Sequence, residues 1–423
     1  MIGAGAAGLC CARELVARGH EPVVFERADH VGGVWAYDPR VEDDPLGLSP
    51  TQRIHASMYE ALRTNLPRRL MSFRDDSFTV GDQEFPGHAA VGEYLRGFVD
   101  RQRLESFLRL EHEVVRVVPR LESGRPWAWP ETMDAARWDV VVRHAGVERT
   151  EQFGAIAVCN GHFSEPNVPA IDGLEVFPGP TLHSHNYRVP DSFADQQVLI
   201  IGAKASGVDI SRDIATVAAR VHLCARGHVG CEHVGVRGNI ERRANVARLH
   251  ADRAATLDDG TRLEGIDAVI LCTGYRYHFG FLDPAARIVD IVDNNVEPLW
   301  LDLVAARLPT AAFIGLPFMV VPFALFERQA AFFGGLLAGT VALPSLEARL
   351  ADARQKNERR DQLGIARRHR LRLGDGQLAY CRELSRRCGY PELPEWFSRL
   401  HEVVRAARRE HPDDYRDRAL PDL

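Results

Sequence analysis

The chain begins with MIGAGAAG (residues 1–8), in which Gly3, Gly5 and Gly8 follow the G-x-G-x-x-G spacing. Glycines at these positions permit a tight turn and let the backbone approach a pyrophosphate at the start of a helix. Residues 9–20 (LCCARELVARGH) predict that helix. The stretch therefore predicts a Rossmann-type unit for FAD or NAD, against the alternative of a glycine-rich turn that binds nothing.

The residues on either side of this loop supply its acid and its strand. Residues 21–27 (EPVVFER) predict a buried strand that carries Glu26, and an acid about 20 residues past the loop is expected to bind a ribose. Only Met1 and Ile2 precede the first glycine, whereas strands usually run about five or six residues. We expect a clipped first strand, either because the sequence starts late or because the sheet tolerates a stub.

Two later turns carry residues that could face a cofactor. Residues 30–38 (HVGGVWAYD) contain a double glycine followed by Trp35, and their position after the acid favours FAD at the first loop. Further on, Thr64 and Asn65 precede Pro67, which disfavours helix at the residue before it. From spacing alone, we interpret Asn65 as an amide that caps a turn.

A second glycine loop, IIGAKASG (residues 200–207), lies between a predicted strand and a predicted helix, residues 208–220. Lys204 replaces the middle glycine, which could weaken pyrophosphate binding or add a cation beside it. Glu26 lies 18 residues past the first loop, and the same offset from the second loop reaches Ala225, followed by Arg226. The absence of an acid there, with a basic residue beside its place, favours the 2′-phosphate of NADPH over NADH, although Arg226 could also be a solvated charge.

Three further segments lie around the second loop, two before it and one after it. Residues 155–162 (AIAVCNGH) and 267–275 (DAVILCTGY) resemble each other and bracket the second loop, which predicts an inserted domain. Between the loops, FPGPTLHSHNYR (residues 177–188) places two histidines at i, i+2. A chain that holds two redox nucleotides usually passes electrons from one to the other.

The composition excludes several classes of protein. The chain has 423 residues and a net charge of −6, which gives no electrostatic footprint for nucleic acid. The longest apolar stretch, residues 311–343, is interrupted by prolines and charges, so we expect no transmembrane segment. The 8 cysteines show no framework spacing, which favours a reducing, cytoplasmic location. We expect no metal, since His183 and His185 have no acid or thiol close in sequence.

Taken together, these motifs resemble those of the flavin-containing monooxygenases, and the likeness extends over nearly the whole chain. Residues 177–188 match the family pattern F-x-G-x-x-x-H-x-x-x followed by an aromatic, here Tyr187. The related Baeyer–Villiger enzymes are expected to carry Trp there. Residues 202–215 (GAKASGVDISRDIA) are similar to the plant glucosinolate S-oxygenase branch, in which the middle glycine is commonly absent as well.

The resemblance implies an α/β fold with two Rossmann-like dinucleotide-binding domains, the NADPH domain inserted in the FAD domain. The expected divisions are residues 1–166 and 281–423 for FAD, and 167–280 for NADPH. The resemblance implies FAD contacts from Gly3, Ala4, Gly5, Ala6, Ala7, Gly8, Glu26, Gly33, Val34, Trp35, Thr64 and Asn65. It implies NADPH contacts from Gly202, Ala203, Lys204, Ala205, Ser206, Gly207 and Arg226. It also makes Asn65 the catalytic residue, which replaces the turn-cap interpretation, and gives His183 an architectural role.

The implied activity is NADPH- and oxygen-dependent S- or N-oxygenation of thioethers or amines through a flavin hydroperoxide. Such chemistry requires no catalytic acid, base or nucleophile from the protein. The expected partners are a small-molecule substrate and molecular oxygen, with a possible homo-oligomer. Alternatives are a Baeyer–Villiger oxygenase of ketones, a disulfide reductase (disfavoured because no CxxC pair exists), and a non-catalytic relic that has lost FAD.

Overall fold

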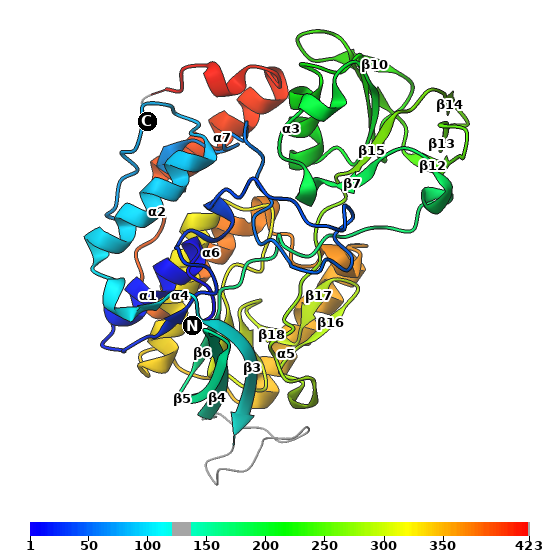
Figure 1. Ribbon diagram of the computed structural model, residues 1–423. Coiled ribbons are helices and arrows are strands. Elements are labelled where there is room, and N and C mark those ends of the chain that lie inside the picture. The colour runs from blue at the N-terminus through cyan, green and yellow to red at the C-terminus, as the bar shows by residue number, and fades with distance from the viewer. Residues whose placement is uncertain (121–136, 422–423) are drawn as a thin grey trace.

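The computed structural model describes residues 1–120 and 137–421 (Figure 1). One mixed sheet contains the N-terminal stub, because Ile2 bridges in parallel to Phe25 and Val158. β6 pairs in parallel with β20, and β19 and β18 continue the sheet in antiparallel fashion. Its strands are β1 (Val24–Phe25), β2 (Leu108–Arg109), β6 (Ile156–Val158), β18 (Leu299–Trp300), β19 (Val304–Ala305) and β20 (Ala311–Phe313).

A hydrophobic core forms around this sheet from helices distant in sequence. Leu9 and Leu15 of α1, Tyr94 of α2 and Phe332 of α4 belong to one buried cluster. The longest apolar stretch of the sequence thus becomes strand β20 and the largely buried helix α4. The helices are α1 (Ala6–Val16), α2 (His88–Gln102), α3 (Ala205–Ile214), α4 (Pro322–Leu337), α5 (Leu346–Gln362), α6 (Gln377–Cys388) and α7 (Glu395–Glu410).

A second, six-stranded sheet has the order β10-β11-β9-β8-β15-β7. Its strands are parallel except β10, which pairs antiparallel with β11 at one edge. Ile210 and Ile214 of α3 pack on Val198 and Ile200 of β8, and Figure 1 shows this group apart from α1 and α2. The strands are β7 (Thr181–His183), β8 (Gln197–Ile201), β9 (Arg220–Cys224), β10 (Glu232–Val234), β11 (Ile240–Arg243) and β15 (Ala268–Leu271).

Smaller antiparallel sheets complete the described chain. β3 (Glu113–Arg120), β4 (Arg137–His144) and β5 (Val147–Phe153) form one, and a tight turn at Gly146 joins β4 to β5. The others are β12 (Val246–Leu249), β13 (Ala255–Leu257) and β14 (Arg262–Leu263), and the pair β16 (Asp290–Val292) and β17 (Asn295–Glu297). Across the described residues, no helix is long and apolar enough to cross a membrane.

Two elements are shorter than the sequence pattern predicts. A single helix is expected from residue 88 to 110, but α2 ends at Gln102 because Arg103 adopts a left-handed conformation (φ 54°). The chain then turns and forms β2 beside β1. The strand predicted over residues 21–27 is reduced to Val24–Phe25, which matches the short first strand beside it.

Candidate nucleotide and active site

The first glycine loop is held by hydrogen bonds on both sides of the stub. The N–H of Ile2 donates to Ala157 O at 3.0 Å, and the N–H of Cys159 donates to Ile2 O at 2.9 Å. On the other side, the N–H of Gly3 donates to Phe25 O at 2.8 Å. These bonds place the first loop between β1 and β6.

Glycine is required at two points of this loop. Gly3 has φ +100°, and a Cβ there would lie 2.7 Å from Cys159 O. A Cβ on Gly8 would overlap the carbonyl oxygen of Gly3. Helix α1 begins with Gly5 as its N-cap, without a side-chain cap and without an acid in its first turn. Its first N–H groups are thus left for an anion, so the residues present fit a dinucleotide pyrophosphate.

Glu26 lies at the end of β1 and binds the loop backbone. Its Oε2 accepts the N–H of Ala4 at 2.8 Å, and its Oε1 accepts the N–H of Ala28 at 2.9 Å. The side chain is half-buried. A carboxylate retains further lone pairs after two such bonds, so Glu26 can still accept from ribose hydroxyls.

The predicted flavin-facing turn contacts the same loop. The N–H of Gly32 donates to Ala4 O at 3.0 Å, and a Cβ on Gly33 would lie 2.9 Å from Gly5 Cα. Val34 and Trp35 follow in a 3₁₀ turn, and Trp35 packs against the main core. The structure therefore brings the first loop and this turn together, although they are separated by an entire helix and strand in sequence.

Thr64 and Asn65 differ from the expected turn chemistry. Thr64 is the residue that closes the turn, because its hydroxyl donates to Leu66 O at 2.8 Å. Asn65 is half-buried, and its amide makes no hydrogen bond within the described residues. The turn-cap interpretation of Asn65 is therefore wrong for its side chain, which is left with donors and an acceptor for another group.

The second loop repeats the backbone contacts of the first. The N–H of Gly202 donates to Cys224 O at 2.8 Å, and the N–H of Cys272 donates to Ile201 O at 2.8 Å. A Cβ on Gly202 would overlap Cys272 O, and one on Gly207 would overlap Gly202 O. The two cysteine turns that resemble each other in sequence thus occupy equivalent places beside the two loops.

Lys204 takes the place of the middle glycine without distorting the backbone. It is the N-cap of α3 with φ −92° and ψ −162°, close to the φ −75° and ψ −175° of Gly5. Its side chain is exposed, and so is that of Ala205 beside it. As in α1, no side chain caps the helix and no acid lies in its first turn.

Arg226 lies one residue past the position at which the first loop has its acid. The first glycine of each loop donates to the carbonyl that ends the neighbouring strand, Phe25 O in one unit and Cys224 O in the other. Ala225 is therefore the structural equivalent of Glu26, and Arg226 follows it directly. Arg226 is exposed and forms no ion pair within the described residues. It therefore remains available to an anion at the end of β9.

The segment 177–188 is built into the second sheet and fastened to α3. A Cβ on Gly179 would overlap Asp267 O, so only glycine fits there. Tyr187 is buried, and its hydroxyl donates to Asp213 Oδ2 at 2.6 Å. Burial, with the neighbouring Asp191, raises the pKa of Asp213, which the bond from Tyr187 partly offsets. Tyr187, the last aromatic of segment 177–188, thus contacts helix α3, which follows the second glycine loop.

The two histidines of this segment are fully buried. His183 Nδ1 accepts the N–H of His185 at 3.1 Å, and burial lowers the pKa of His183 to about 3. His185 Nε2 lies 3.1 Å from Glu42 Oε1, so an acid distant in sequence is close in space. These contacts hold the linker in place and fit an architectural role for His183.

The comparisons with known proteins now decide the family. The sequence matches the family described as "Flavin-binding monooxygenase-like" over residues 1–234 and 231–398. The chain belongs to this family. It is 38% identical to flavin-containing monooxygenase FMO GS-OX-like 4 of Arabidopsis thaliana, covering 99% of this chain and 93% of that relative. The expected enzyme class, a flavoprotein monooxygenase, is confirmed.

Solved structures give the same result for the fold. S-allyl-L-cysteine S-oxygenase from Allium sativum superposes with a TM-score of 0.91 at 37% identity, covering 99% of this chain and 94% of that one. Tmm from Pelagibacter sp. strain HTCC7211 superposes with a TM-score of 0.81 at 24% identity, covering 99% and 92%, and shows the fold alone. The monooxygenase therefore has the expected α/β fold of flavin-dependent relatives.

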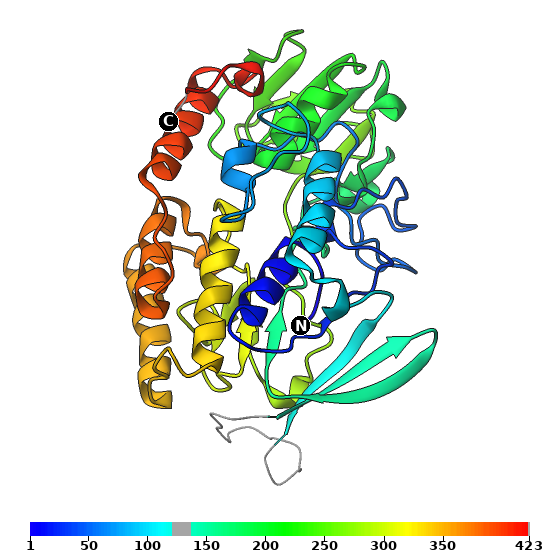
Figure 2. The same cartoon turned by 90° about the vertical axis from the view of Figure 1, so that its left-hand side faces the viewer.

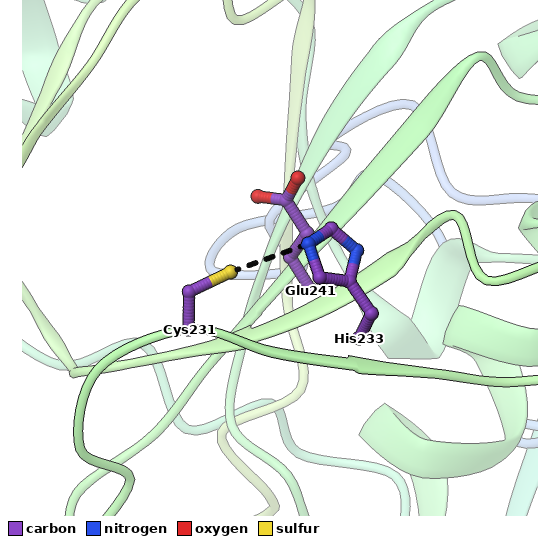
Figure 3. Close-up of side chains that lie close together, drawn as sticks. All are labelled: Cys231, His233 and Glu241. Carbon is purple, nitrogen blue, oxygen red and sulfur yellow. Dashed lines mark hydrogen bonds between the residues drawn. The ribbon is translucent and has the colours of Figure 1, made fainter.

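One group of side chains in the described part of the monooxygenase could supply three metal ligands. Cys231, His233 and Glu241 place their ligand atoms within 4.8 Å of one another (Figure 3). However, the Glu241 carboxylate binds Arg243 Nη2 at 2.7 Å and lies 3.4 Å from Nε of Arg220. A divalent cation would compete with two guanidinium groups for the same carboxylate, so we assign no metal there.

Sequence reasoning missed the polar residues that join these parts. Buried Arg188 donates to backbone carbonyls of residues 38, 40, 56, 185 and 187. Asp209 and Asp213 of α3 bind Arg416 and Tyr187. The quoted VDISRDIA stretch contained both acids, but their partners lie elsewhere in the sequence.

Proposed function

We propose that this monooxygenase uses NADPH and oxygen to transfer one oxygen atom to a soft sulfur or nitrogen nucleophile, such as a thioether or an amine. The observation that carries the proposal is the contrast between two equivalent strand ends. One ends in Glu26, which suits a ribose hydroxyl; the other has Ala225 at that position, which removes the acid and leaves the following Arg226 to suit a 2′-phosphate. The 37% identity to an S-allyl-L-cysteine S-oxygenase supports the substrate class.

The chain divides accordingly into two Rossmann-type units. We propose that residues 1–166 and 281–423 bind FAD and that residues 167–280 bind NADPH. β6 and β20 pair with each other, whereas β7 to β11 and β15, which lie between them in sequence, form a separate and mainly parallel sheet. This arrangement supports an inserted nucleotide-binding unit.

The first loop, Glu26 and the turn at residues 32–35 would hold the FAD. When bound, the flavin supplies the redox chemistry: it takes electrons from NADPH and activates molecular oxygen. The residues of the chain bind and orient this group. The uncapped start of α1 provides N–H donors, and Gly33 packs on the loop so closely that no side chain stands between them.

Asn65 is proposed to hydrogen-bond the flavin and the nicotinamide nucleotide. The hydroxyl of Thr64 bonds within the turn, and among the residues that the structure describes the amide of Asn65 has no hydrogen-bond partner. Lys204 and the exposed N-terminus of α3 would bind the NADPH pyrophosphate, and Arg226 its 2′-phosphate. The role of the chain is to orient these groups and to exclude water.

A Baeyer–Villiger oxygenase remains the second candidate. Tyr187, rather than Trp, at the end of the 177–188 segment favours sulfur or nitrogen oxygenation. The non-catalytic alternative depended on the short first strand, and the hydrogen bonds of Ile2 on both sides count against it. Cytoplasmic residence fits the eight free cysteines.

The test is NADPH consumption with oxygen across a panel of thioethers, tertiary amines and cyclic ketones, with product and hydrogen peroxide measured together. We expect a sulfoxide or N-oxide and little peroxide. Lactone or ester formation from ketones would favour the second candidate. A colourless purified protein that cannot be reconstituted with FAD would refute the proposed function.

A further inference from the structure

The C-terminal segment after α7 reaches the nucleotide half of the molecule. Figures 1 and 2 show it beside α3. Tyr415 is buried, packs with Leu400 of α7, and meets Phe85 edge-on at 5.4 Å between ring centroids. This apolar anchor fixes the short 3₁₀ turn Tyr415–Asp417 and thereby the direction of Arg416.

Arg416 contacts both proposed cofactor regions at once. Its Nη2 and Nη1 bind Asp209 Oδ2 and Oδ1 at 2.6 and 3.2 Å. Its Nε donates to Thr64 O at 2.9 Å. Burial alone would lower the pKa of Arg416, but the bond to Asp209 raises it, so the guanidinium stays charged. Arg63 strengthens the contact by donating to Arg416 O at 3.1 Å.

The two groups that Arg416 joins have distinct roles. Thr64 directly precedes Asn65, whose amide has no partner in the described chain. Asp209 lies on α3, which begins inside the second glycine loop. A cavity of about 220 Å³ lies between α3, the C-terminal turn and residues 59–63. Most of the residues that line it are charged, and two ion pairs, Arg416 with Asp209 and Arg212 with Asp413, join the C-terminal segment to α3 beside it.

We propose that Arg416 is a positioning residue that sets the Thr64–Asn65 backbone relative to the nucleotide on loop 202–207. The inference rests on the proposed NADPH site and extends it to a residue in the C-terminal segment. Only a planar guanidinium can bind both oxygens of Asp209 and a third acceptor in one plane; a lysine ammonium cannot. The contact therefore couples nucleotide binding on one loop to the position of the Asn65 amide.

The test uses the full-length FAD-loaded protein and the variants Arg416→Gln, Arg416→Lys and Asp209→Asn. The control is Arg418→Gln, since Arg418 belongs to the same segment but forms only an exposed pair with Asp414. Amide hydrogen exchange of residues 60–67 is measured with and without NADP⁺. We expect NADP⁺ to slow exchange in the wild type and in Arg418→Gln, and to have no effect in the other three variants.

Turnover gives the second measurement. We expect the ratio of oxygenated product to NADPH consumed to fall about tenfold in Arg416→Gln, with peroxide rising, while the KM for NADPH changes less than about threefold.

Melting temperatures close to wild type exclude simple misfolding, and Arg416→Lys provides a milder variant if Arg416→Gln melts early. Retained slowing by NADP⁺ in Arg416→Gln and Arg416→Lys, or no slowing in the wild type, overturns the inference. A wild type that binds NADP⁺ but yields only peroxide overturns the proposed function instead, and the exchange result still decides the role of Arg416.

Discussion

The loop at residues 3–8 and the loop at residues 202–207 share their backbone contacts and differ in three side chains. In both, the first glycine has a positive φ and lies against the carbonyl of a cysteine at the end of a neighbouring strand. The differences are Gly5 against Lys204, Ala7 against Ser206, and, at the strand end, Glu26 against Ala225; the next residue is an arginine in both cases, Arg27 and Arg226.

This difference separates what the fold requires from what the ligand requires. The first and last glycines are needed because backbone atoms occupy the space of a side chain. The middle position has ordinary extended φ and ψ in both loops, and a Cβ on Gly5 would meet Gly33 Cα at 3.5 Å, an ordinary contact distance, so the backbone does not demand glycine there. At the strand ends no backbone atom excludes a side chain, although the Glu26 carboxylate also binds the N–H groups of Ala4 and Ala28, so ligand chemistry bears most directly on Arg226.

The largest effect is expected from an alanine at the last glycine of either loop. A Cβ on Gly8 or Gly207 would overlap a backbone carbonyl that no rotamer can move, at a cost of about 3 kcal/mol or more. We expect Gly8→Ala to lose FAD, and Gly207→Ala to retain FAD while the KM for NADPH rises more than about tenfold. Flavin absorbance, melting temperature and NADPH kinetics measure these effects.

The matched control for this pair is Gly154→Ala, because nothing lies within 4 Å of a Cβ there. It should leave flavin content and NADPH kinetics unchanged. If Gly207→Ala loses FAD while Gly8→Ala keeps it, the assignment of the two cofactors to the two loops is reversed.

A smaller effect is expected at the strand end of the second loop. A charge-assisted bond from Arg226 to a 2′-phosphate contributes about 2 kcal/mol, or a factor of about 30 in affinity. Arg226→Ala should therefore raise the KM for NADPH by about that factor and leave kcat and the KM for NADH nearly unchanged. Steady-state kinetics with both nucleotides measures the preference.

The double variant Ala225→Glu/Arg226→Ala sharpens the same comparison. It copies the acid of the first loop into the second and should shift preference toward NADH. Arg248→Ala, an exposed arginine on β12, is the control. An unchanged preference in both Arg226 variants would mean that the 2′-phosphate lies elsewhere.

Local patterns in the sequence were sufficient for much of this site. The glycine spacing, the offsets to Glu26 and Arg226, and the likeness of the two cysteine turns all depend on neighbouring residues, and the structure places them as expected. Strand QVLII at residues 197–201 and helix α3 follow from the same local periodicity. Family membership follows from the order of such motifs.

Contacts between distant residues were not predictable in this way. Arg416 and Asp209 are 207 positions apart, and nothing in either stretch indicates the other. The end of α2 depends on one left-handed residue, Arg103, which apolar periodicity does not register. Spacing alone favoured Asn65 as the turn-capping residue, whereas the side chain that bonds within the turn is that of Thr64 beside it.

The smallest effect is expected at the residue that breaks the glycine pattern. Lys204 already has the backbone conformation of Gly5, so Lys204→Gly removes a cation without changing the turn. An exposed charge of this kind contributes about 0.2 to 1 kcal/mol, so the KM for NADPH should rise less than about fivefold.

Lys204→Met keeps the side-chain bulk and removes only the charge, and it should behave like Lys204→Gly. Because the interaction is electrostatic and exposed, the difference from wild type should also shrink as salt is raised from about 0.01 M to about 1 M. If the KM for NADPH rose more than about tenfold in Lys204→Gly but not in Lys204→Met, the Lys204 side chain would be shaping the loop. Position 204 would then be determined by the fold as well as by the ligand.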